Sequence, residues 1–448
     1  MGLAIDGSTA GSQGSTALVA TDAVVVGAGP AGIAAAVRAS ESGLRVVVLD
    51  EGFGAGGQIW RHRPERSPKG DAGRWLERFA RSQAQLMAGT TVVDAHRLGE
   101  RGFLLVAECG GNPVHVSAKR LILATGARER FIPFPGWTIP GVIGIGGAQA
   151  LLKSGTSFHG KRVVIAGSGP LLLPVAAALS RAGARVLVVA EQASTSSVAR
   201  FAAGLWRNPQ LLLQAMLYRA SFRQARYRTG TWALAGVGDD KIREVTLTNG
   251  RETWREAVDV LCTGYGLVPN VGLAQLLGCA TDDGAVTVDA QQETTVPHVF
   301  AAGEVTGIGG APLSIAEGEI AGLAATGRSG AALSIVHHRT ALRDYARNMV
   351  VAFALREELR TLPTPTTVVC RCEDVPYGSL STARSSRQAK LYTRAGMGPC
   401  QGRVCGPALE FLFDWEPDTT RSPLQPARVS TICDDVADIT PLVTSPSH

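Results

Sequence analysis

Apolar runs that end at glycines alternate with alanine-rich segments along much of the chain. The first run, 24–32, reads VVVGAGPAG and leads into an alanine-rich stretch at 33–40. Another apolar run, 44–49, follows and ends in Asp50 and Glu51. Short continuous apolar runs are typical of buried strands, and the alanine-rich stretch favours a helix. Residues 22–50 therefore predict a β–α–β unit with two parallel strands.

The turn between this strand and helix carries a Gly-x-Gly-x-x-Gly pattern. The first glycine permits a tight turn, the second lets backbone amides approach a pyrophosphate, and the third lets the helix pack on the strand. The helix N-terminus then binds the anion, and a carboxylate about 20 residues further on binds a ribose. We predict a nucleotide site formed by Gly27, Gly29, Pro30, Ala31, Gly32, Asp50 and Glu51, and by Gly57 and Gln58 of the glycine-rich loop 52–63.

Residues 161–190 repeat the opening pattern of strand, glycine turn, helix and strand. Here Leu172 stands where the third glycine is expected, and a side chain there should displace the helix or reshape the turn. This second unit is therefore predicted to be a degenerate NAD(P)-type domain, retained as a scaffold or holding another nucleotide. Its uncharged stretch 163–180 contains glycines and prolines, which favour a buried strand, turn and helix over a membrane span.

The remaining segments complete an α/β fold with two Rossmann-like dinucleotide-binding domains and a small C-terminal domain. Strand patterns return at 258–263 and 286–303, and helical patterns at 309–325 and 335–359. The predicted domains are a disordered lead-in (1–20), a discontinuous FAD-type domain (21–155 and 285–335), the degenerate domain (156–284), a helix and linker (336–365), a cysteine domain (366–413) and a tail (414–448).

The composition favours a globular protein in a reducing compartment. The chain has 448 residues, of which 45% are hydrophobic and 18% charged, with a net charge of +6. The basic residues are interspersed with acids and form no run with aromatic residues, so nucleic-acid binding is not expected. The first 20 residues lack a basic segment followed by an apolar core, so we expect no export signal and a cytoplasmic protein without stable membrane insertion.

Four of the eight cysteines form a spaced set near the C-terminus. Cys370 and Cys372 belong to an extended stretch, TVVCRC, in which alternate side chains face the same side. Cys400 and Cys405 lie in GMGPCQGRVCGP, just before a predicted helix whose positive end favours thiolates. Four thiolates suit an iron–sulfur cluster or zinc, although zinc sites more often show C-x₂₋₄-C pairs at both ends. Unligated thiols remain the third alternative.

Three segments together resemble the two-dinucleotide-binding-domain flavoproteins, the superfamily of glutathione and thioredoxin reductases. They are GAGPAG with its downstream acid, ATGA at 124–127 and VFAAGE at 299–304. The resemblance implies that Asp50 binds the adenosine ribose of FAD, that Thr125 and Gly126 pack beside the FAD, and that Gly303 and Glu304 meet its ribityl and pyrophosphate groups. The chain has no C-x-x-C between or within the two units, which argues against a disulfide reductase.

The cysteine spacing resembles the bacterioferritin-associated-ferredoxin-like [2Fe–2S] domain. Together with the flavin pattern, it resembles the larger, α-type subunits of hetero-oligomeric flavin-dependent amino-acid and opine dehydrogenases, over about 21–413. This implies an electron-transfer subunit whose partner, a glycine-oxidase-like flavoprotein β subunit, oxidises the C–N bond, with or without a small γ subunit. In some relatives FMN lies at a subunit interface, or another nucleotide replaces FAD.

Two other functions stay open at this point. The chain could be a self-sufficient NAD(P)H-dependent flavoprotein reductase, which the substitution at Leu172 argues against. It could also be a scaffold that holds a nucleotide structurally and binds zinc. No Ser/His/Asp or Cys/His set and no acid–base carboxylate pair is evident, so we predict no catalytic residue in this chain.

Overall fold

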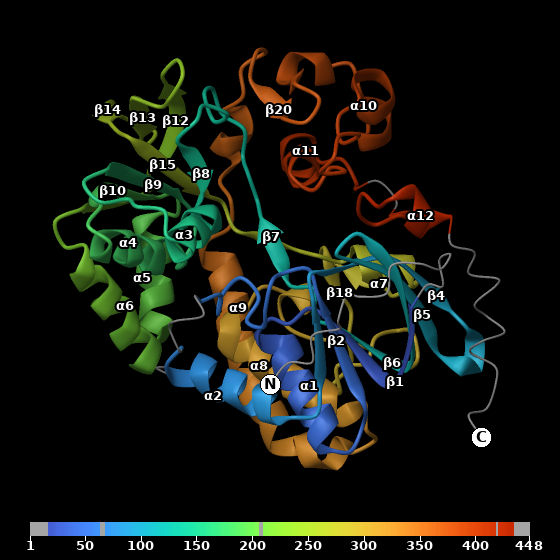
Figure 1. The fold of residues 1–448 in the computed structure, drawn as a ribbon. Helices are drawn as coiled ribbons and strands as arrows, with labels where there is room; N and C mark the ends of the chain where they lie inside the picture. Colours follow the sequence, from blue (N-terminus) through green and yellow to red (C-terminus); the bar gives the residue numbers. More distant parts are fainter. Residues whose placement is uncertain (1–16, 63–67, 206–208, 418–419, 434–448) are drawn as a thin grey trace, which may run out of the picture.

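Two β-sheets, each covered by helices, form the body of the protein, and a small cysteine module lies above them in Figure 1. The computed structural model describes residues 17–62, 68–205, 209–417 and 420–433. The α/β fold with two Rossmann-like units is confirmed. Residues 1–16 of the expected lead-in and 434–448 of the expected tail lie outside the described residues.

The first sheet has seven strands, and its inner strands are parallel. At the carboxyl end of β6, β1 pairs on one side and β19 on the other, while β5 pairs with the earlier half of β6. The strand order is β3 (Gln85–Ala88), β2 (Val46–Asp50), β1 (Ala17–Val26), β6 (Asn112–Leu123), β5 (Phe103–Cys109) and β4 (Thr90–Arg97), with β19 (Val299–Ala301) beside β6.

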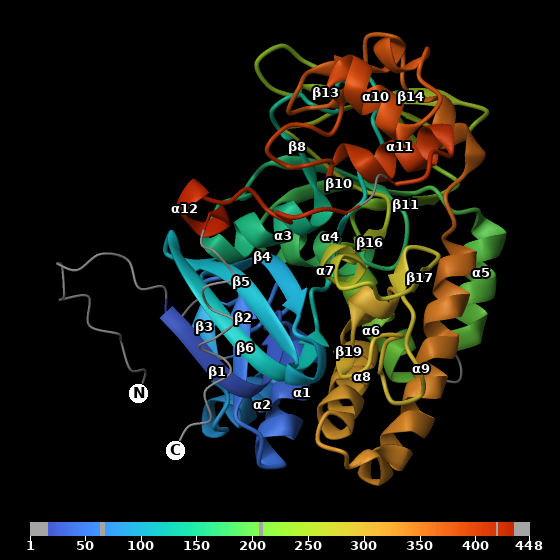
Figure 2. The ribbon, with the colours of Figure 1, turned by 90° about the vertical axis from the view of Figure 1, so that its right-hand side faces the viewer.

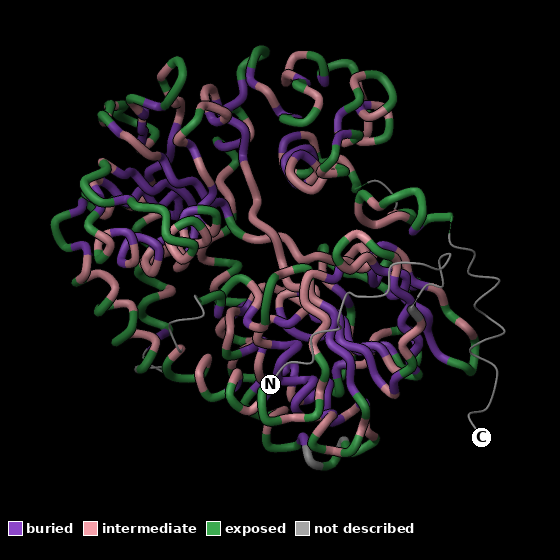
Figure 3. The backbone as a smooth tube through the Cα atoms, viewed as in Figure 1, coloured by how far each residue is buried: buried purple, intermediate pink, exposed green. Residues whose placement is uncertain are grey.

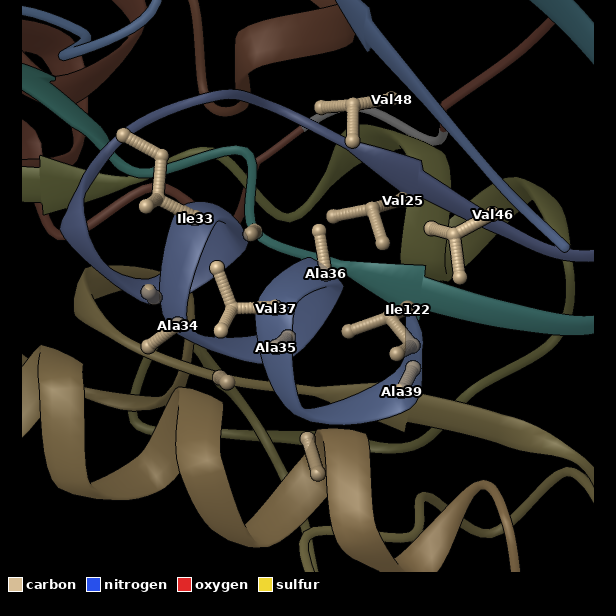
Figure 4. Packing of buried hydrophobic residues seen from close by; sticks show 14 of the residues in the cluster. Val25, Ile33, Ala34, Ala35, Ala36, Val37, Ala39, Val46, Val48 and Ile122 are labelled. Carbon is tan, nitrogen blue, oxygen red and sulfur yellow. The ribbon is translucent and has the colours of Figure 1, made fainter. Parts of the chain in front are cut away.

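Helix α1 (Pro30–Glu41) packs its small side chains against this sheet. Figure 4 shows Ile33 and Ala36 facing Val25, Val48 and Ile122 of the strands. On its other side α1 contacts α8 (Gly310–Ala324), where Gly318 and Gly322 let the two backbones approach. The run of alanines therefore places α1 close to both neighbours and fixes its N-terminus at the end of the sheet.

The second sheet is entirely parallel, in the order β11 (Arg226–Thr229), β10 (Arg185–Glu191), β9 (Arg162–Gly167), β15 (Val260–Gly264) and β8 (Val142–Gly144). One face packs on α4 (Leu172–Arg181) with α3 (Ile145–Ser154) and α6 (Pro209–Ser221) alongside. The opposite face packs on the meander β12 (Trp232–Val237), β13 (Glu244–Thr248) and β14 (Thr253–Ala257). The stretch 163–180 is a strand, turn and helix as predicted, and no helix in the described residues is long and apolar enough to cross a bilayer.

Several predicted boundaries differ from the structure. Residues 17–20, expected in the lead-in, belong to β1 because the long strand β6 pairs with them. Strand β8 lies in the second sheet although it falls within 21–155, and α7 (Gly272–Leu276) packs in the first core although it falls within 156–284. The helix expected over 335–359 is α9 (Leu333–Ala352), which ends earlier.

The cysteine module contains β20 (Val368–Cys370), β21 (Val375–Pro376), α10 (Ser386–Thr393) and α11 (Cys405–Phe413). The chain then returns over the first sheet, where Leu424 N donates to Val93 O at 2.8 Å and α12 (Val429–Ile432) contacts β5 and β6. Figure 2 shows this return path from module to sheet. The described part of the tail thus attaches the module to the first unit.

Buried residues concentrate in the two sheets and their covering helices, as the purple segments of Figure 3 show. Two further short pairs of strands occur: β7 (Ala127–Glu129) with β16 (Leu267–Pro269), and β17 (Thr281–Asp282) with β18 (Ala285–Val286). The remaining helices are α2 (Gly70–Arg81) and α5 (Thr195–Gly204). Strand β7 follows β6 of the first sheet and β16 follows β15 of the second, so this pair lies where the chain passes between the two units.

Candidate nucleotide site and cysteine centre

The first glycine turn lies where the carboxyl ends of β1, β6 and β19 meet, the usual ligand site of a parallel sheet. Gly27 has φ 104°, and a Cβ there would overlap the carbonyl oxygen of Ala124. A Cβ on Gly32 would overlap the carbonyl oxygen of Gly27. Both positions therefore require glycine, for the close packing that the motif predicts.

The N-terminus of α1 opens directly from this turn. The helix begins at Pro30, with Gly29 as its N-cap residue. Within the described residues, no backbone carbonyl bonds the N–H groups of Ala31 or Gly32. These are the unsatisfied first-turn donors to which a helix attracts phosphate. A Cβ on Gly29 would meet nothing within 4 Å, so space remains beside these donors.

The two acids after β2 have different surroundings. Asp50 accepts hydrogen bonds from Ala28 N at 2.5 Å and from Gly52 N at 2.7 Å, so each of its oxygens holds a loop of the site. Glu51 is exposed.

The glycine-rich loop after these acids packs on the glycine turn, because Gly56 N donates to Ala28 O at 2.8 Å. Gly57 follows at φ 56°, half-buried, and a Cβ there would meet the Cα of Gly29. The next residue, Gln58, is exposed. The structure therefore brings both predicted loop residues close to the first glycine turn.

The turn after β6 is held by a residue that the sequence analysis did not identify. Thr125 Oγ1 donates to Asn270 O at 2.8 Å, and Asn270 Nδ2 donates back to Thr125 O at 2.9 Å. Asn270 N also donates to the carbonyl of Gly126 at 2.9 Å. Asn270 follows β16 and lies 145 residues after Thr125 in the sequence. No local pattern in the sequence signals a contact over that separation.

A buried ionic network holds the turn after β19. Glu317 of α8 is 1% exposed and accepts from Gly303 N at 3.0 Å and Thr306 Oγ1 at 2.7 Å. Arg343 of α9 donates to the other oxygen of Glu317 at 2.8 and 2.9 Å. Neither residue was predicted, although an acid inside the apolar stretch 313–323 was a signal of a buried, paired charge.

Glu304 caps α8, since its Oε1 accepts from Gly310 N at 2.8 Å. Burial raises the pKa of Glu304 to about 7, although N–H groups of Gly310 and Gly309 act in the opposite direction. Its other oxygen, Oε2, is buried and finds no hydrogen-bond partner among the described residues. A buried acceptor without a partner beside Gly303 is the property expected of a ligand-binding side chain.

The four spaced cysteines line one cavity of about 250 Å³, together with Phe131, Trp137, Arg371 and Val404. Cys370 ends β20, so Cys372 lies in the following turn and is exposed, not on the strand as predicted. The thiols interact electrostatically with one another: Cys372 with Cys400 and Cys370, and Cys405 with Cys370 and Cys400. Among the described residues, no three His, Cys, Asp or Glu side chains are placed to hold a metal ion.

The surroundings of these thiols are unequal. Burial raises the pKa of Cys405, which starts α11 and is 2% exposed. Burial also acts to raise the pKa of Cys400, but the backbone N–H groups of the loop 402–404 and the side chain of Cys372 together outweigh it, and the pKa is lowered. The module is attached at this cavity, because Trp137 Nε1 donates to Val368 O at 2.6 Å. Backbone donors aimed at sulfur favour a thiolate.

The second glycine turn has a different start to its helix. Helix α4 begins at Leu172, whereas α1 begins at Pro30, the position that corresponds to Pro170. Of the two predicted outcomes, a displaced helix or a reshaped turn, the structure shows the reshaped turn. Glu191, at the end of β10, accepts from Gly169 N and Ala193 N, both at 2.8 Å. Burial raises the pKa of Glu191 to about 7, against the effect of these two N–H groups. This carboxylate is 0% exposed.

The comparison with known families agrees with this architecture. Residues 21–322 match the family described as pyridine nucleotide-disulphide oxidoreductase. The chain belongs to this family. Its members are oxidoreductases, and membership supports FAD as the nucleotide of the first unit.

Within this oxidoreductase family the chain has several relatives that are named as parts of larger enzymes. It is 31% identical to the HcnB subunit of hydrogen cyanide synthase from Pseudomonas protegens, over 85% of this chain and 89% of the relative. It is also 31% identical to the A-type subunit of opine oxidase from Rhizobium meliloti, over 92% and 98% of the two chains. The structure of L-proline dehydrogenase from P. horikoshii shares the fold, with a TM-score of 0.64, 18% identity, and coverage of 94% of this chain and 81% of that one.

Proposed function

We propose that this oxidoreductase is the electron-transfer subunit of a hetero-oligomeric dehydrogenase, carrying FAD in its first unit and a [2Fe–2S] cluster in its cysteine module. The observation that carries the proposal is the meeting of four thiols, from motifs 28 residues apart between Cys372 and Cys400, around one cavity. FAD exchanges electrons singly or in pairs, and a cluster of this kind transfers them singly. The partner would be a glycine-oxidase-like flavoprotein that oxidises the C–N bond of an amino acid or opine.

The residues of the first unit fit FAD. The N–H groups of Ala31 and Gly32 would bind the pyrophosphate, and Gly29 leaves room for its approach. We expect Asp50 to bind the ribose, because each of its oxygens accepts one backbone hydrogen bond and keeps a second lone pair for a hydroxyl group. The same two bonds fix the position of the carboxylate.

The turn after β19 would hold the middle of the nucleotide. The buried Oε2 of Glu304 is an acceptor that a ribityl hydroxyl could satisfy. Gly303 is held by Glu317, and its φ of 81° and the closeness of Ala31 leave no room for a side chain. Thr125 and Gly126, held by Asn270, would pack beside the FAD.

The cysteine cavity fits a two-iron cluster better than a single zinc ion. A two-iron cluster needs two thiols per iron, and four thiols line this cavity. Zinc sites more often show C-x₂₋₄-C pairs at both ends, whereas here the first pair is Cys370-x-Cys372. The N–H groups of 402–404 around Cys400 are donors of the kind that stabilise cluster sulfur.

The names of the relatives support a partner-dependent role. The relatives from hydrogen cyanide synthase and opine oxidase are each one subunit of an enzyme. The sequence itself contains no evident acid–base set. The alternative, a self-sufficient NAD(P)H-dependent reductase, requires a working second unit, whose turn is reshaped at Leu172.

Single Cys→Ser variants of Cys370, Cys372, Cys400 and Cys405 test the cluster. We expect about two iron and two labile sulfide per wild-type chain and a rhombic paramagnetic signal on reduction, with each variant losing most of both. Cys433→Ser is the matched control, since this exposed cysteine lies outside the cavity and the iron content should not change. Zinc in place of iron in anaerobically purified wild type would contradict the proposal.

A further inference from the structure

The second glycine turn is in contact with a segment from far along the same chain. Ser168, inside the turn, donates its hydroxyl to the carbonyl of Phe353 at 2.8 Å. Gln192, directly after the buried Glu191, donates its Nε2 to the carbonyl of Ala354 at 3.0 Å. Its Oε1 accepts from Arg356 N at 3.2 Å. Ser168 and Gln192 are 6% and 0% exposed, whereas Ala354 is exposed, so these contacts are partly buried.

We propose that residues 353–356, which we call the plug, are a built-in occupant of the second dinucleotide site and close it to nicotinamide and adenine nucleotides. The plug presents two carbonyl oxygens, those of Phe353 and Ala354, to donors at the edge of the glycine turn. Oxygens of a nucleotide would otherwise compete for this edge. The closure holds whether or not the first unit binds FAD.

The start of α4 offers one N–H group fewer to a phosphate than the start of α1. The N–H groups of Leu172 and Leu173 donate to the carbonyls of Gly169 and Pro170, both at 3.2 Å. In α1, Gly32 corresponds to Leu172, and its N–H has no backbone partner among the described residues, whereas Ile33 corresponds to Leu173, and its N–H donates to Gly29 O at 2.9 Å. An anion at the second turn would have to break the bond of Leu172 N before this amide could bind it, which weakens the site even without the plug.

The ribose position is closed as well. One oxygen of Glu191 accepts from Gly169 N in the glycine turn and the other from Ala193 N in the following loop, and the side chain has no exposed surface. The next residue, Gln192, is also 0% exposed and donates to Ala354 O of the plug.

Ring contacts fix the plug in place. The ring of Phe353 meets Phe201 of α5 edge-on, with centroids 5.1 Å apart, and it is the nearest group to a Cβ placed on Gly169. The guanidinium of Arg356 lies over the buried ring of Trp232 at 4.5 Å. Such contacts add to the four hydrogen bonds between the plug and its seat.

The plug also has a structural consequence. It follows α9, whose Arg343 holds the turn of the first unit through Glu317, and it precedes the linker to the cysteine module. Figure 2 shows α9 running beside α5 of the second unit. One helix therefore connects the turn of the first unit with the closed turn of the second. The second unit serves as an anchor for the segment that leads to the cysteines.

Hydrogen exchange of the full-length holoprotein tests this closure directly. We expect the hydrogen-bonded amides of Phe353, Arg356, Ser168 and Gly169 to exchange slowly in wild type, with rates unchanged by saturating NADH, NADPH or NAD⁺, and calorimetry to show no binding of these nucleotides. The double variant Ser168→Ala/Gln192→Ala removes the side-chain donors and the acceptor of Arg356 N, and exchange of the Arg356 amide should rise about tenfold, equivalent to about 1.4 kcal/mol. Ser221→Ala, a surface serine of the same domain, is the control and should not change it.

Three results would overturn the proposal. One is binding of a nicotinamide nucleotide by wild type at the second turn, with faster exchange at 353–356, which would make the plug a displaceable gate. Another is such binding without any change at 353–356. The third is rapid exchange of the Arg356 amide in wild type itself, a result that does not depend on any variant being folded.

Discussion

The two dinucleotide units of this protein have nearly the same strands and glycine turns, yet only one turn is open. In each unit a carboxylate after the second strand bonds the glycine turn and a following loop: Asp50 in the first and Glu191 in the second. The turns then diverge at one position. Gly32 lets α1 begin early with free amides, whereas Leu172 delays α4.

This difference teaches that a preserved strand and turn do not ensure a preserved ligand site. The second unit keeps its buried sheet and its acid, and it has become a seat for residues 353–356. The first unit keeps its amides and an unpartnered acceptor on Glu304 among the residues that the structure describes. The fold can tolerate loss of the ligand in one unit because the chain itself supplies the missing contacts.

The largest expected effect comes from breaking the support of the first turn. Glu317→Ala removes the buried partner of Arg343 and the acceptor for Gly303 N, which should reduce the free energy of unfolding by about 3–5 kcal/mol. Chemical denaturation measures it. Glu319→Ala, on the same helix with its own partner Arg38 nearer the surface, is the control and should lose no more than about 1 kcal/mol. Equal losses would contradict the role of Glu317.

The free energy of unfolding, measured over a range of pH, compares wild type with Glu191→Gln, which replaces the acid of the second unit by a neutral amide. The pKa of Glu191 is raised from 4.5 to about 7, so the folded state keeps a proton that the unfolded state has released. Wild type should therefore lose stability as the pH rises from 4.5 to 7, by up to about 3 kcal/mol from this group. Glu191→Gln should lack this part of the slope. An unchanged slope would show that Glu191 is ionised throughout.

A smaller effect is expected where the first turn meets its ligand. Gly29→Ala adds a methyl group into open space, so the apoprotein should keep its stability. The methyl group would lie where a pyrophosphate approaches, and affinity for FAD should fall about tenfold or more, equivalent to about 1.4 kcal/mol or more. Fluorescence titration of apoprotein with FAD measures it. Gly147→Ala, also in open space but away from the turn, should leave the affinity unchanged.

Local sequence patterns correctly predicted those helices, strands and turns whose formation is determined by residues close together in the sequence. The two repeated units, the glycine turns and the helix at 310–324 follow from apolar runs and glycine spacing. Contacts between distant segments were not predicted. Asn270 lies 145 residues from Thr125, and the plug lies about 185 residues from Ser168. No periodicity connects such positions, because they meet only in the tertiary structure. Whether the predicted residues bind FAD and a cluster stays a prediction.

The most direct test of the contrast between the units is the nucleotide content of the purified holoprotein. Denaturation should release about one FAD per wild-type chain, identified by mass, and no nicotinamide nucleotide. Gly29→Ala should release much less FAD from an equally folded chain, while Ser168→Ala should release the wild-type amount. Two nucleotides per wild-type chain, a bound NAD(P), or full FAD content in Gly29→Ala would contradict an open first unit and a closed second one.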